Sequence, residues 1–501
     1  MAQITVTNLT FGYEGSPDNV FEGLSFQLDT DWKLGFIGRN GKGKTTFLRL
    51  LLGKYEYSGS ISSAAVFDYF PYELGEEEKK KLTIDVVEGL EPDYELWKVC
   101  REMSLMDCDA QCLYRSFDTL SNGEQTKVML ALLFSKDNHF LLIDEPTNHL
   151  DMETRKLVMN YLNKKKGFIL VSHDRAFLDG CIDHVLAFNR ESVEIQQGNF
   201  SSWWENKKRR DAFEQNENEK LKREIKSLQE SARRTAQWAD KVEQTKIGFN
   251  PMKEDRDIST RAYIGEKSRR MQQRRKNLER RQNEAIDEKE GLLKDIEETE
   301  QLKLEALKFH REVSVRAKEL VLLYGSKELF LPVDFEVKNG AILAFCGKNG
   351  CGKSSILKRL MGAEIETQGV LEVAAGLVIS YVPQDASFLS GGLREFIRES
   401  GIGESLFKAV LRKLDFERAQ FEKRMEDYSE GQKKKVLLAR SLCTPAHLYI
   451  WDEPLNYIDV FSRMQLEELV KRLRPTLLVV EHDRVFLENI GAELVEIGTE
   501  D

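Results

Sequence analysis

The chain has 501 residues, which suggests about three domains of roughly 150 residues each. Hydrophobic residues make up 41% of the chain and charged residues 32%, enough to bury cores beneath an unusually charged surface. The formal net charge of −10 excludes a chain that is basic throughout, although a local basic patch remains compatible with that total.

The first residues, MAQITVTNLT, lack the basic segment and apolar core of a secretory signal. The longest purely apolar runs, such as Val128–Phe134, have about seven residues, whereas a membrane-spanning helix needs roughly 20. The seven cysteines form no paired CxxC motifs, so we expect reduced structural thiols. These features predict a cytoplasmic protein without a membrane domain.

In residues 1–200, apolar runs typical of buried strands alternate with helical patterns, which predicts a mostly parallel α/β core. The run KLGFIG leads into the loop GRNGKGKTT (38–46), which fits G-x-x-x-x-G-K-[ST]. Glycines let the backbone N–H groups of such a loop face a phosphate, and the following helix adds its positive end. Lys44 is expected to reach the β- and γ-phosphates and Thr45 to hold Mg²⁺. The other loop residues expected at the nucleotide are Gly38, Asn40, Gly41, Gly43 and Thr46.

Two later strands of this region end in polar residues. HFLLIDE (139–145) ends in two carboxylates, of which Asp144 is placed to bind Mg²⁺ and Glu145 to polarise the attacking water as general base. GFILVSHD contains His173, which could sense the γ-phosphate. Because ligands of parallel sheets bind beyond the carboxyl ends of the strands, we expect these side chains to meet at the phosphate loop.

Residues 201–312 differ in character from both flanking regions. Apolar residues recur at spacings of four, three and four from Leu221 to Ala232, which indicates an amphipathic helix with a narrow apolar seam. A second helical pattern runs from about 259 to 307, and a glycine and a proline interrupt the chain between them. The pattern predicts a long helical hairpin with its tip near 246–258.

The middle of this insert is basic. From Ser231 to Arg281 it holds 15 Lys or Arg and 7 Asp or Glu. A solvated helix face is one explanation of such a run. Contact with a negatively charged target is the other, because Arg-rich helices suit phosphate backbones and the interleaved aromatic side chains could stack on bases. The residues expected to make that contact are Lys246, Phe249, Lys253, Arg256 and Arg261.

Residues 313–501 repeat the pattern of the first 200 residues. The loop GKNGCGKSS, the run HLYIWDE and the run TLLVVEHD recur in the same order with an offset of 308 or 309 residues. This order indicates a duplicated domain, and it argues against an incidental glycine-rich turn, a helix-capping acidic pair or a purely structural histidine. The counterparts, with the same expected roles, are Gly347, Asn349, Gly350, Gly352, Lys353, Ser354, Ser355, Asp452, Glu453 and His482.

The phosphate loops, the segments LSNGEQTK and YSEGQKKK, the D-E-P carboxylates and the histidines together resemble the ATP-binding-cassette ATPases. In that family two cassettes face head to tail, and each ATP lies between one phosphate loop and the signature helix of the other cassette. The resemblance therefore implies ATP and Mg²⁺ as cofactors and a monomer whose two cassettes pair with each other. It assigns the signature pair Ser429 and Gly431 to the site on Lys44, the pair Ser121 and Gly123 to the site on Lys353, and Tyr13 and Tyr324 to stacking on adenine.

Several departures from the family pattern predict that the two sites are asymmetric. Tyr72 in DYFPYE stands where the second half keeps Gln384, and the family's glutamine at this position orients water and touches Mg²⁺. A phenol does this poorly, so the first site is expected to hydrolyse differently. The remaining departures are Tyr428 and Glu430 in the second signature, and Leu455 and Tyr457 where the first half has Thr147 and His149.

Two cassettes and a charged helical linker look like the ABC-F class of translation factors, and GNFSSWWENKKRR resembles that class's exit into its linker. ABC-F proteins bind the ribosomal E site and extend the linker toward the P-site tRNA and the peptidyl-transferase centre. The long linker, the EPLNYID variant and the missing first glutamine resemble the antibiotic-resistance branch, which protects ribosomes from lincosamides, streptogramin A and pleuromutilins. The implied partners are the bacterial 70S ribosome, its 23S rRNA and the P-site tRNA.

Three other functions remain as alternatives. A housekeeping ABC-F factor would act on stalled ribosomes without any drug. The ATPase subunit of a membrane transporter would leave the long linker without a purpose. A DNA-organising ATPase would carry its coiled coil between the phosphate loop and the signature of one cassette, whereas here each cassette is complete.

Overall fold

The structure is a computed structural model of the 501-residue chain. It describes residues 3–14, 19–136, 139–148, 150–188, 193–247, 270, 273, 276–277, 280–281, 302–325 and 327–498, and between 232 and 247 it describes one side chain, that of Arg234. The chain divides into two compact units, Met1–Trp203 with Glu300–Asp501, and Trp204–Thr299.

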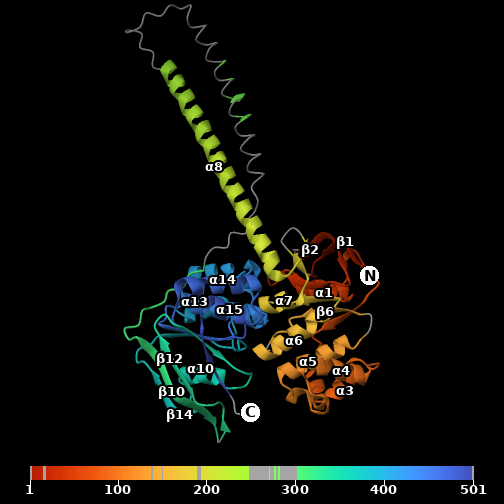
Figure 1. Cartoon of the computed structure of the whole chain (residues 1–501). Helices are drawn as coiled ribbons and strands as arrows, with labels where there is room; N and C mark the ends of the chain where they lie inside the picture. The colour runs from red at the N-terminus through yellow and green to blue at the C-terminus, as the bar shows by residue number, and fades with distance from the viewer. Residues whose placement is uncertain are drawn as a thin grey trace, which may run out of the picture. The chain divides into compact units, whose positions relative to one another are not determined.

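The first half of the larger unit is built on a mostly parallel sheet (Figure 1). Among the described residues its strand order is β5 (Val66–Phe70), β6 (His139–Asp144), β7 (Phe168–Val171), β3 (Lys33–Ile37), β8 (His184–Phe188) and β9 (Val193–Gln197). All neighbours are parallel except β8 and β9. A separate antiparallel sheet has the order β2 (Phe21–Asp29), β1 (Gln3–Phe11) and β4 (Ser58–Ser62).

The second half repeats this plan. Its parallel sheet has, within the described ranges, the order β15 (Ile379–Val382), β16 (Leu448–Asp452), β17 (Leu477–Val480), β13 (Ile342–Cys346) and β18 (Glu493–Glu496). In its antiparallel sheet β10 (Val313–Tyr324) pairs with β11 (Lys327–Glu328), β12 (Val333–Lys338) and β14 (Glu366–Val373). The predicted fold class, tandem α/β domains with parallel sheets, is confirmed.

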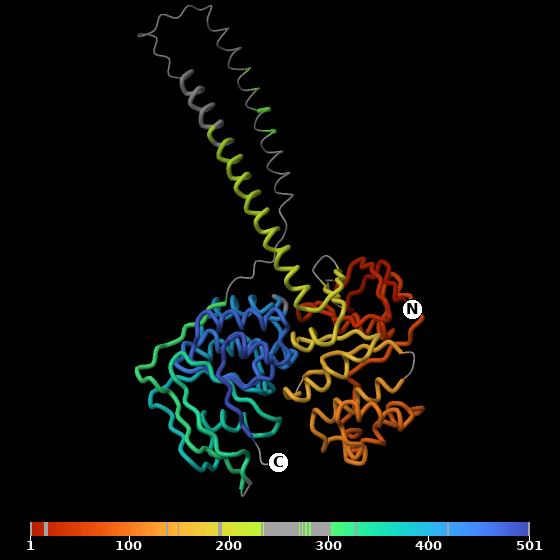
Figure 2. Tube along the Cα trace, viewed as in Figure 1, coloured from red at the N-terminus to blue at the C-terminus, as the bar shows by residue number. Residues whose placement is uncertain are grey.

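Helices pack around both sheets (Figure 1). Those of the first half are α1 (Lys44–Leu51), α2 (Glu76–Lys79), α3 (Thr83–Leu90), α4 (Leu96–Leu105), α5 (Asn122–Phe134), α6 (Met152–Asn163) and α7 (Arg175–Cys181). Those of the second half are α10 (Lys353–Leu360), α11 (Leu393–Glu399), α12 (Glu404–Lys413), α13 (Glu430–Cys443), α14 (Val460–Leu473) and α15 (Arg484–Ile490). Figure 2 follows the same path along the chain.

β16, the strand of the second parallel sheet that ends in the carboxylates, is buried on both faces. Tyr449 and Trp451 of β16 belong to one core, beneath α11 to α14, while Leu448 and Ile450 belong to the core on the other face, beneath α10 and the antiparallel sheet. A strand covered on both faces needs an uninterrupted apolar run, which explains why HLYIWDE shows no polar alternation. The polar residues can therefore stand only at the end of the strand.

Six site helices begin at a residue whose side chain accepts a backbone hydrogen bond. Ser121 and Ser429 form capping boxes at α5 and α13, each with the residue three positions later. Aspartates cap the other four: Asp151 at α6, Asp174 at α7, Asp459 at α14 and Asp483 at α15. Local sequence thus fixes where each helix begins, at the edge of the sheet where the loops meet.

The predicted linker begins with a single long helix, α8 (Phe200–Ile247), of 48 residues. Its first turn is buried in the larger unit: Phe200 and Trp203 pack together, and the Trp203 ring lies 6.4 Å from that of Phe461 on α14. Of the second predicted helix, 259–307, the described residues 270, 273, 276–277 and 280–281 are helical, whereas 302–307 are not. The tip at 248–258 and the side chains of the five proposed contact residues lie outside the described residues. No helix in the described ranges is both long and apolar enough to cross a bilayer.

The segment that follows the linker differs from the boundary expected at 313. Leu302 and Leu304 are buried in the core of the second half, and Ala306 forms a β-bridge with Ala446. Apolar residues at alternating positions explain this packing, because they line one face of an extended chain. The second half therefore starts its packing about ten residues before its first strand.

A buried carboxylate joins α4 to the end of α6 in the first half. Glu102 is about 1% exposed, accepts a hydrogen bond from the Tyr161 hydroxyl at 2.7 Å and pairs with Lys165 and Arg101. Burial alone would raise the pKa of Glu102, but these donors outweigh it and hold that pKa below the ordinary value of 4.5.

We therefore predict that Glu102→Gln lowers the free energy of unfolding by about 1–3 kcal/mol at pH 7, because it weakens charge-assisted hydrogen bonds. A pKa that is lower in the folded state gives stability above the unfolded pKa that is lost as the pH falls through the folded pKa. The difference from wild type should hence shrink below about pH 4.5. Denaturant unfolding at pH 7 and pH 3.5 measures it, with exposed Glu88→Gln as control. A difference that does not change with pH would contradict the prediction.

Candidate nucleotide-binding sites

The first phosphate loop connects β3 to α1. Gly43 has φ of 82°, a left-handed value that suits glycine, and a Cβ there would lie 2.6 Å from Phe21. The Lys44 ammonium donates to the carbonyls of Gly38 at 2.7 Å and Arg39 at 3.0 Å, so it lies inside the curve of the loop. The cradle and its cation are both formed, which fits the binding of a phosphate chain.

The two predicted metal ligands of the first half contact each other. The Thr45 hydroxyl donates to Asp144 Oδ2 at 2.8 Å, and the hydroxyl of Tyr69, on the neighbouring strand β5, donates to the same oxygen at 3.1 Å. Burial raises the pKa of Asp144. These oxygen donors suit Mg²⁺, which would neutralise phosphate charge at this position when bound. Tyr69 has no signal in the sequence, because it is one aromatic residue in an ordinary strand.

Glu145 follows Asp144 in a strained backbone position. Its φ is 51°, and its N–H is held by the carbonyl of Val171 at 2.9 Å. Its Oε1 lies 3.3 Å from His173 Nε2. Burial, followed by the charge of Asp144, raises the pKa of Glu145 to about 8, while burial and the charge of Lys44 lower that of His173. A carboxylate that exchanges protons near neutral pH beside a neutral imidazole suits general-base catalysis.

The second phosphate loop has the same internal contacts. Gly352 has φ of 98°, and the Lys353 ammonium donates to the carbonyls of Gly347 and Lys348, both at 2.8 Å. The Ser354 hydroxyl donates to Asp452 Oδ1 at 3.1 Å. Burial raises the pKa of Asp452 to about 6.

The catalytic candidates of the second half are arranged differently. Glu453 has φ of 46°, but its Oε1 lies 3.9 Å from His482 Nε2, and its Oε2 accepts a 2.5 Å hydrogen bond from the side chain of Asn456. Burial, with the charges of Arg155 and Lys353, lowers the pKa of His482 to about 3. The imidazole is therefore neutral in both halves, whereas the carboxylate has a different partner in each.

Contacts between the halves bring the first loop to the second signature. Asn40 donates to the carbonyl of Tyr457 at 2.9 Å, and Arg39 pairs with Asp415 at 3.2 Å. A Cβ on Gly431 would lie 2.6 Å from that carbonyl and 3.5 Å from the Asn40 amide, so this signature position has room only for glycine. The head-to-tail arrangement implied for the site on Lys44 matches this geometry.

The second phosphate loop also contacts the opposite half. The Asp151 carboxylate, which caps α6 of the first half, accepts a hydrogen bond from the backbone N–H of Asn349. Burial alone would raise the pKa of Asp151, but this bond and the N–H of Thr154 lower it. The exposed hydroxyls of Ser121 and Ser429 both cap their own helices.

The two tyrosines assigned to adenine are exposed by 45% at Tyr13 and 55% at Tyr324. The Tyr13 hydroxyl lies 2.7 Å from Thr46 Oγ1 at the start of α1, so its ring stands beside the first loop. Tyr324 ends β10, where it pairs with Lys327. Both rings are open to stacking.

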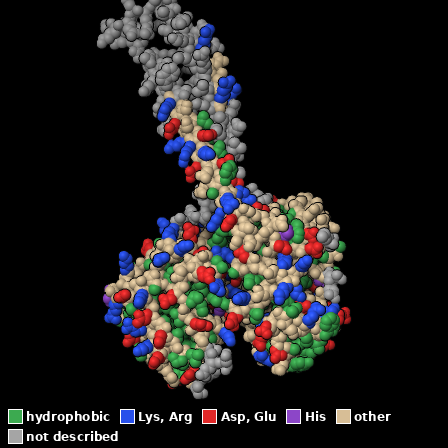
Figure 3. All heavy atoms as spheres, in the orientation of Figure 1, with side chains coloured by type: hydrophobic (Ala, Val, Ile, Leu, Met, Phe, Trp, Pro, Cys, Tyr) green, Lys and Arg blue, Asp and Glu red, His purple; other side chains and the backbone are tan. Residues whose placement is uncertain are grey.

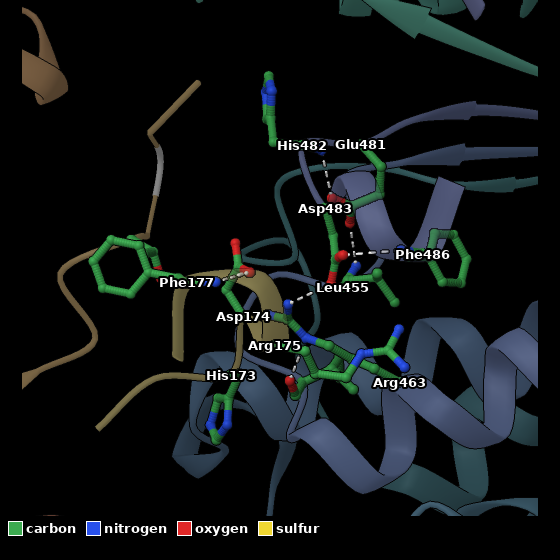
Figure 4. A network of polar contacts seen from close by, with 12 residues as sticks. His173, Asp174, Arg175, Phe177, Leu455, Arg463, Glu481, His482, Asp483 and Phe486 are labelled. Carbon is green, nitrogen blue, oxygen red and sulfur yellow. Dashed lines mark hydrogen bonds and ion pairs between the residues drawn. The ribbon is translucent and has the colours of Figure 1, made fainter. Parts of the chain in front are cut away.

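The residue after each histidine is an aspartate, Asp174 or Asp483, and each aspartate forms an ion pair with a buried arginine. Arg155 binds Asp174 at 3.1 Å in the first half, and Arg463 binds Asp483 at 3.3 Å in the second. Figure 4 shows the His173–Asp174 turn facing the turn from Glu481 to Asp483. Burial and the charge of Asp483 raise the pKa of Asp174, so these side chains of the two halves lie within one electrostatic environment.

Glu481 breaks the symmetry of this network. Its carboxylate accepts hydrogen bonds from the N–H of Leu455 and the N–H of His482, both at 2.8 Å (Figure 4). Its counterpart Ser172 makes a 3.2 Å hydroxyl contact with Thr147 instead. The sequence analysis missed Glu481, although a glutamate at the end of the apolar run TLLVVEHD was a usable signal.

The glutamine position also differs between the halves. The Tyr72 hydroxyl is buried and finds no hydrogen-bond partner among the described residues, and burial with the charge of Asp68 raises its pKa. At Gln384 the main-chain carbonyl accepts from Lys434 at 3.2 Å. Tyr72 and Gln384 therefore have different contacts. That the two sites hydrolyse ATP differently stays a prediction.

A comparison with protein-family models decides the family. The model described as ABC transporter matches residues 21–148 and 330–456, slightly more than half of the chain. The chain belongs to the ATP-binding-cassette family. It is a P-loop ATPase with two ATP-binding cassettes.

Known proteins are similar to this ATP-binding-cassette protein along almost its whole length. Ribosome protection protein VmlR of Bacillus subtilis (strain 168) is 28% identical over 496 residues, covering 97% of this chain and 85% of VmlR. ABC transporter F family member 2 of Arabidopsis thaliana is 26% identical over 552 residues, covering 99% and 76%. Energy-dependent translational throttle protein EttA of Haemophilus influenzae is 25% identical over 536 residues, covering 96% and 90%. These similarities support the ABC-F class.

Solved structures share the tandem-cassette fold. A complex that contains the archaeal ribosome recycling factor aABCE1 aligns with a TM-score of 0.61 at 20% identity, covering 98% of this chain and 87% of that one. A structure named RNase-L Inhibitor aligns with a TM-score of 0.61 at 19% identity, over the same shares.

If Glu145 and Glu453 are the general bases, replacing both by glutamine should lower ATP turnover at least about 100-fold, because an amide cannot accept the proton of the attacking water. ATP binding should persist, because the phosphate loops are unchanged. Phosphate release and binding of a fluorescent ATP analogue measure the two effects. The exposed Glu88→Gln serves as the control, and turnover of the double variant near that of wild type would contradict the assignment.

Proposed function

We propose that this chain is an ATP-dependent, ribosome-binding ABC-F protein that protects the bacterial ribosome from antibiotics of the peptidyl-transferase centre. The similarity to a ribosome protection protein over 97% of the chain carries the proposal, because it includes the linker as well as both cassettes. Cassette similarity alone would suit any ATP-binding-cassette protein. On this proposal the protein works in the cytoplasm, where its partner is the 70S ribosome.

The linker helix suits this task. At 1.5 Å per residue, the 48 residues of α8 form a rod about 72 Å long. Figure 3 shows Lys and Arg side chains interspersed with Asp and Glu along its described part. The sequence segment 231–281, which begins within α8, carries an excess of positive charge. Such a basic segment can bind RNA phosphates although the chain as a whole is acidic.

The proposed cycle uses the two nucleotide sites as a clamp. ATP bound at the head-to-tail contacts closes the cassettes and favours the ribosome-bound form, in which the linker extends from the E site toward the P-site tRNA. Residues at the tip, Lys246, Phe249, Lys253, Arg256 and Arg261, then contact 23S rRNA and displace the drug. Hydrolysis by Glu145 and Glu453 releases the protein.

A housekeeping role on stalled ribosomes is the second candidate. The similarity to EttA, a translational throttle protein, over 96% of the chain favours it. Both candidates share the ATPase sites and the ribosome as partner, and they differ in whether a drug is present.

Ribosome binding is tested by co-sedimentation of the variant Glu145→Gln with Glu453→Gln. With ATP the variant should pellet with 70S ribosomes, because hydrolysis no longer releases it. A matched protein that also carries Lys253→Gln, Arg256→Gln and Arg261→Gln should pellet less and show a weaker dependence on salt, because three phosphate contacts are lost. ATP-loaded protein that stays in the supernatant would overturn the proposal.

Drug protection is tested by expression in a susceptible Gram-positive host. The wild-type chain should raise the inhibitory concentrations of lincomycin and tiamulin, and the chain with Lys253→Gln, Arg256→Gln and Arg261→Gln should raise them less. Unchanged drug sensitivity in cells whose ribosomes carry the protein would favour the housekeeping role.

A further inference from the structure

A buried lysine ties three elements together at the second nucleotide site. Lys434 is the fifth residue of α13 and is about 2% exposed. Its ammonium donates to the carbonyls of Pro383 at 2.8 Å, Gln384 at 3.2 Å and Asp452 at 3.0 Å. An ammonium has three N–H donors, so these three acceptors satisfy it completely. The lysine thus links α13, the loop after β15 and the end of β16.

One of these acceptors belongs to the peptide that joins Asp452 to Glu453. The N–H of this peptide donates to the carbonyl of Val480 at 2.9 Å, and its C=O accepts from Lys434, so both polar atoms are held. Glu453 has φ of 46°, an unfavourable value for a residue with a side chain. Such a conformation persists only when its surroundings impose it, and the peptide orientation sets the direction of the Glu453 carboxylate.

The same ammonium fixes the glutamine loop. Gln384 and its neighbour Pro383 both accept from it, so the position of Gln384 depends on the position of the Asp452 carbonyl. An amide that orients water must be held against the carboxylate that receives the proton. Lys434 supplies that link through main-chain atoms, whatever side chains the loop carries.

The first cassette lacks this clamp. The segments LSNGEQTK and YSEGQKKK align Thr126 with Lys434. A threonine hydroxyl stands on Cβ and cannot reach where an ammonium four methylenes from Cα reaches. The first cassette also has Tyr72 in place of Gln384, and there the Tyr69 hydroxyl contacts the Asp144 carboxylate directly.

Stability alone explains the buried charge poorly. Removing an ammonium from water is costly even when it is hydrogen-bonded, and an apolar side chain of similar volume commonly serves as well in a core. Burial lowers the pKa of Lys434 to about 8, although the charges of Asp452, Glu481 and Glu453 act in the opposite direction. The Lys434 ammonium lies between Glu453, the candidate base, and the loop of Gln384, the candidate water-orienting residue. Its costly burial at this place is better explained by a role in hydrolysis than by a role in stability.

We propose that Lys434 is a positioning residue of the second nucleotide site, holding the Asp452–Glu453 peptide and the Gln384 loop in the arrangement that hydrolysis requires. The proposal rests on hydrolysis at the site of Glu453. It does not depend on the ribosome, so ATPase assays without ribosomes separate its failure from that of the proposed function.

The test measures the second site by itself. In a Glu145→Gln background, Lys434→Met keeps the side-chain volume and removes the three hydrogen bonds. We expect kcat to fall at least about tenfold, while KM for ATP stays within about threefold of its value in the background protein. The reason is that the lost hydrogen bonds position Glu453 and Gln384 for the transition state and do not hold the bound ATP. The matched control is Thr126→Met in a Glu453→Gln background, which should change kcat less than about twofold. If Glu145→Gln alone silences both sites, the same pairs are compared in the wild-type chain.

A conservative variant decides between charge and packing. Lys434→Arg keeps a cation that can donate to carbonyls and should recover most of the turnover lost in Lys434→Met at an equal melting temperature. An unchanged kcat in Lys434→Met, a rise in KM with kcat unchanged, or an Arg variant no better than Met would each overturn the proposal. If Lys434→Met does not fold, Lys434→Arg is judged alone: turnover within about threefold of its background supports the proposal, and a loss beyond about tenfold at native stability overturns it.

Discussion

The sites depend on one electrostatic constraint, the burial of carboxylates at the ends of parallel strands. Asp144, Asp452 and Glu453 are buried and Glu145 is half-buried, and burial raises the pKa of Asp144, Glu145 and Asp452. Such charges stay in a fold only when hydrogen bonds or opposite charges compensate them. At the first site this compensation includes Arg463 of the second cassette, which acts on Glu145, whereas the groups that compensate Asp452 belong to its own cassette.

The contacts across the pair show the same dependence. Asp459 is fully buried in the second cassette, and although burial would raise its pKa, Lys435 at 3.2 Å lowers it. Its charge acts in turn on Lys44 of the first cassette. The two cassettes are thus coupled through buried charges as well as through the pair Arg175 and Glu467 at their surface of contact. A fold built this way favours two unlike sites, since a substitution in one cassette alters the electrostatics of both.

The features that could be predicted from the sequence are those that a local pattern of residues determines. The loop glycines, the strand-ending carboxylates and the duplicated order were visible because each needs a particular residue type at a fixed spacing. The contacts of Tyr69, Glu481 and Lys434 could not be predicted in this way, because each joins segments far apart in the sequence through a single side chain. Lys434 stands in a lysine run that reads as a solvated helix surface, yet its neighbours bury it. Tertiary packing, and not local pattern, buries Lys434 and Lys435 and leaves Lys433 partly exposed.

One aromatic side chain, Phe461, contacts both the first turn of the linker helix α8 and the first phosphate loop. Phe461, the second residue of α14, lies 5.8 Å beneath the Arg39 guanidinium of the first phosphate loop and 6.4 Å from the Trp203 ring. Trp203 is about 1% exposed and belongs to the first turn of α8. Close-packed aromatic contacts transmit displacement because they leave no space to absorb it. A chain of contacts thus runs from Arg39 of the first loop through Phe461 to Trp203 in the first turn of α8.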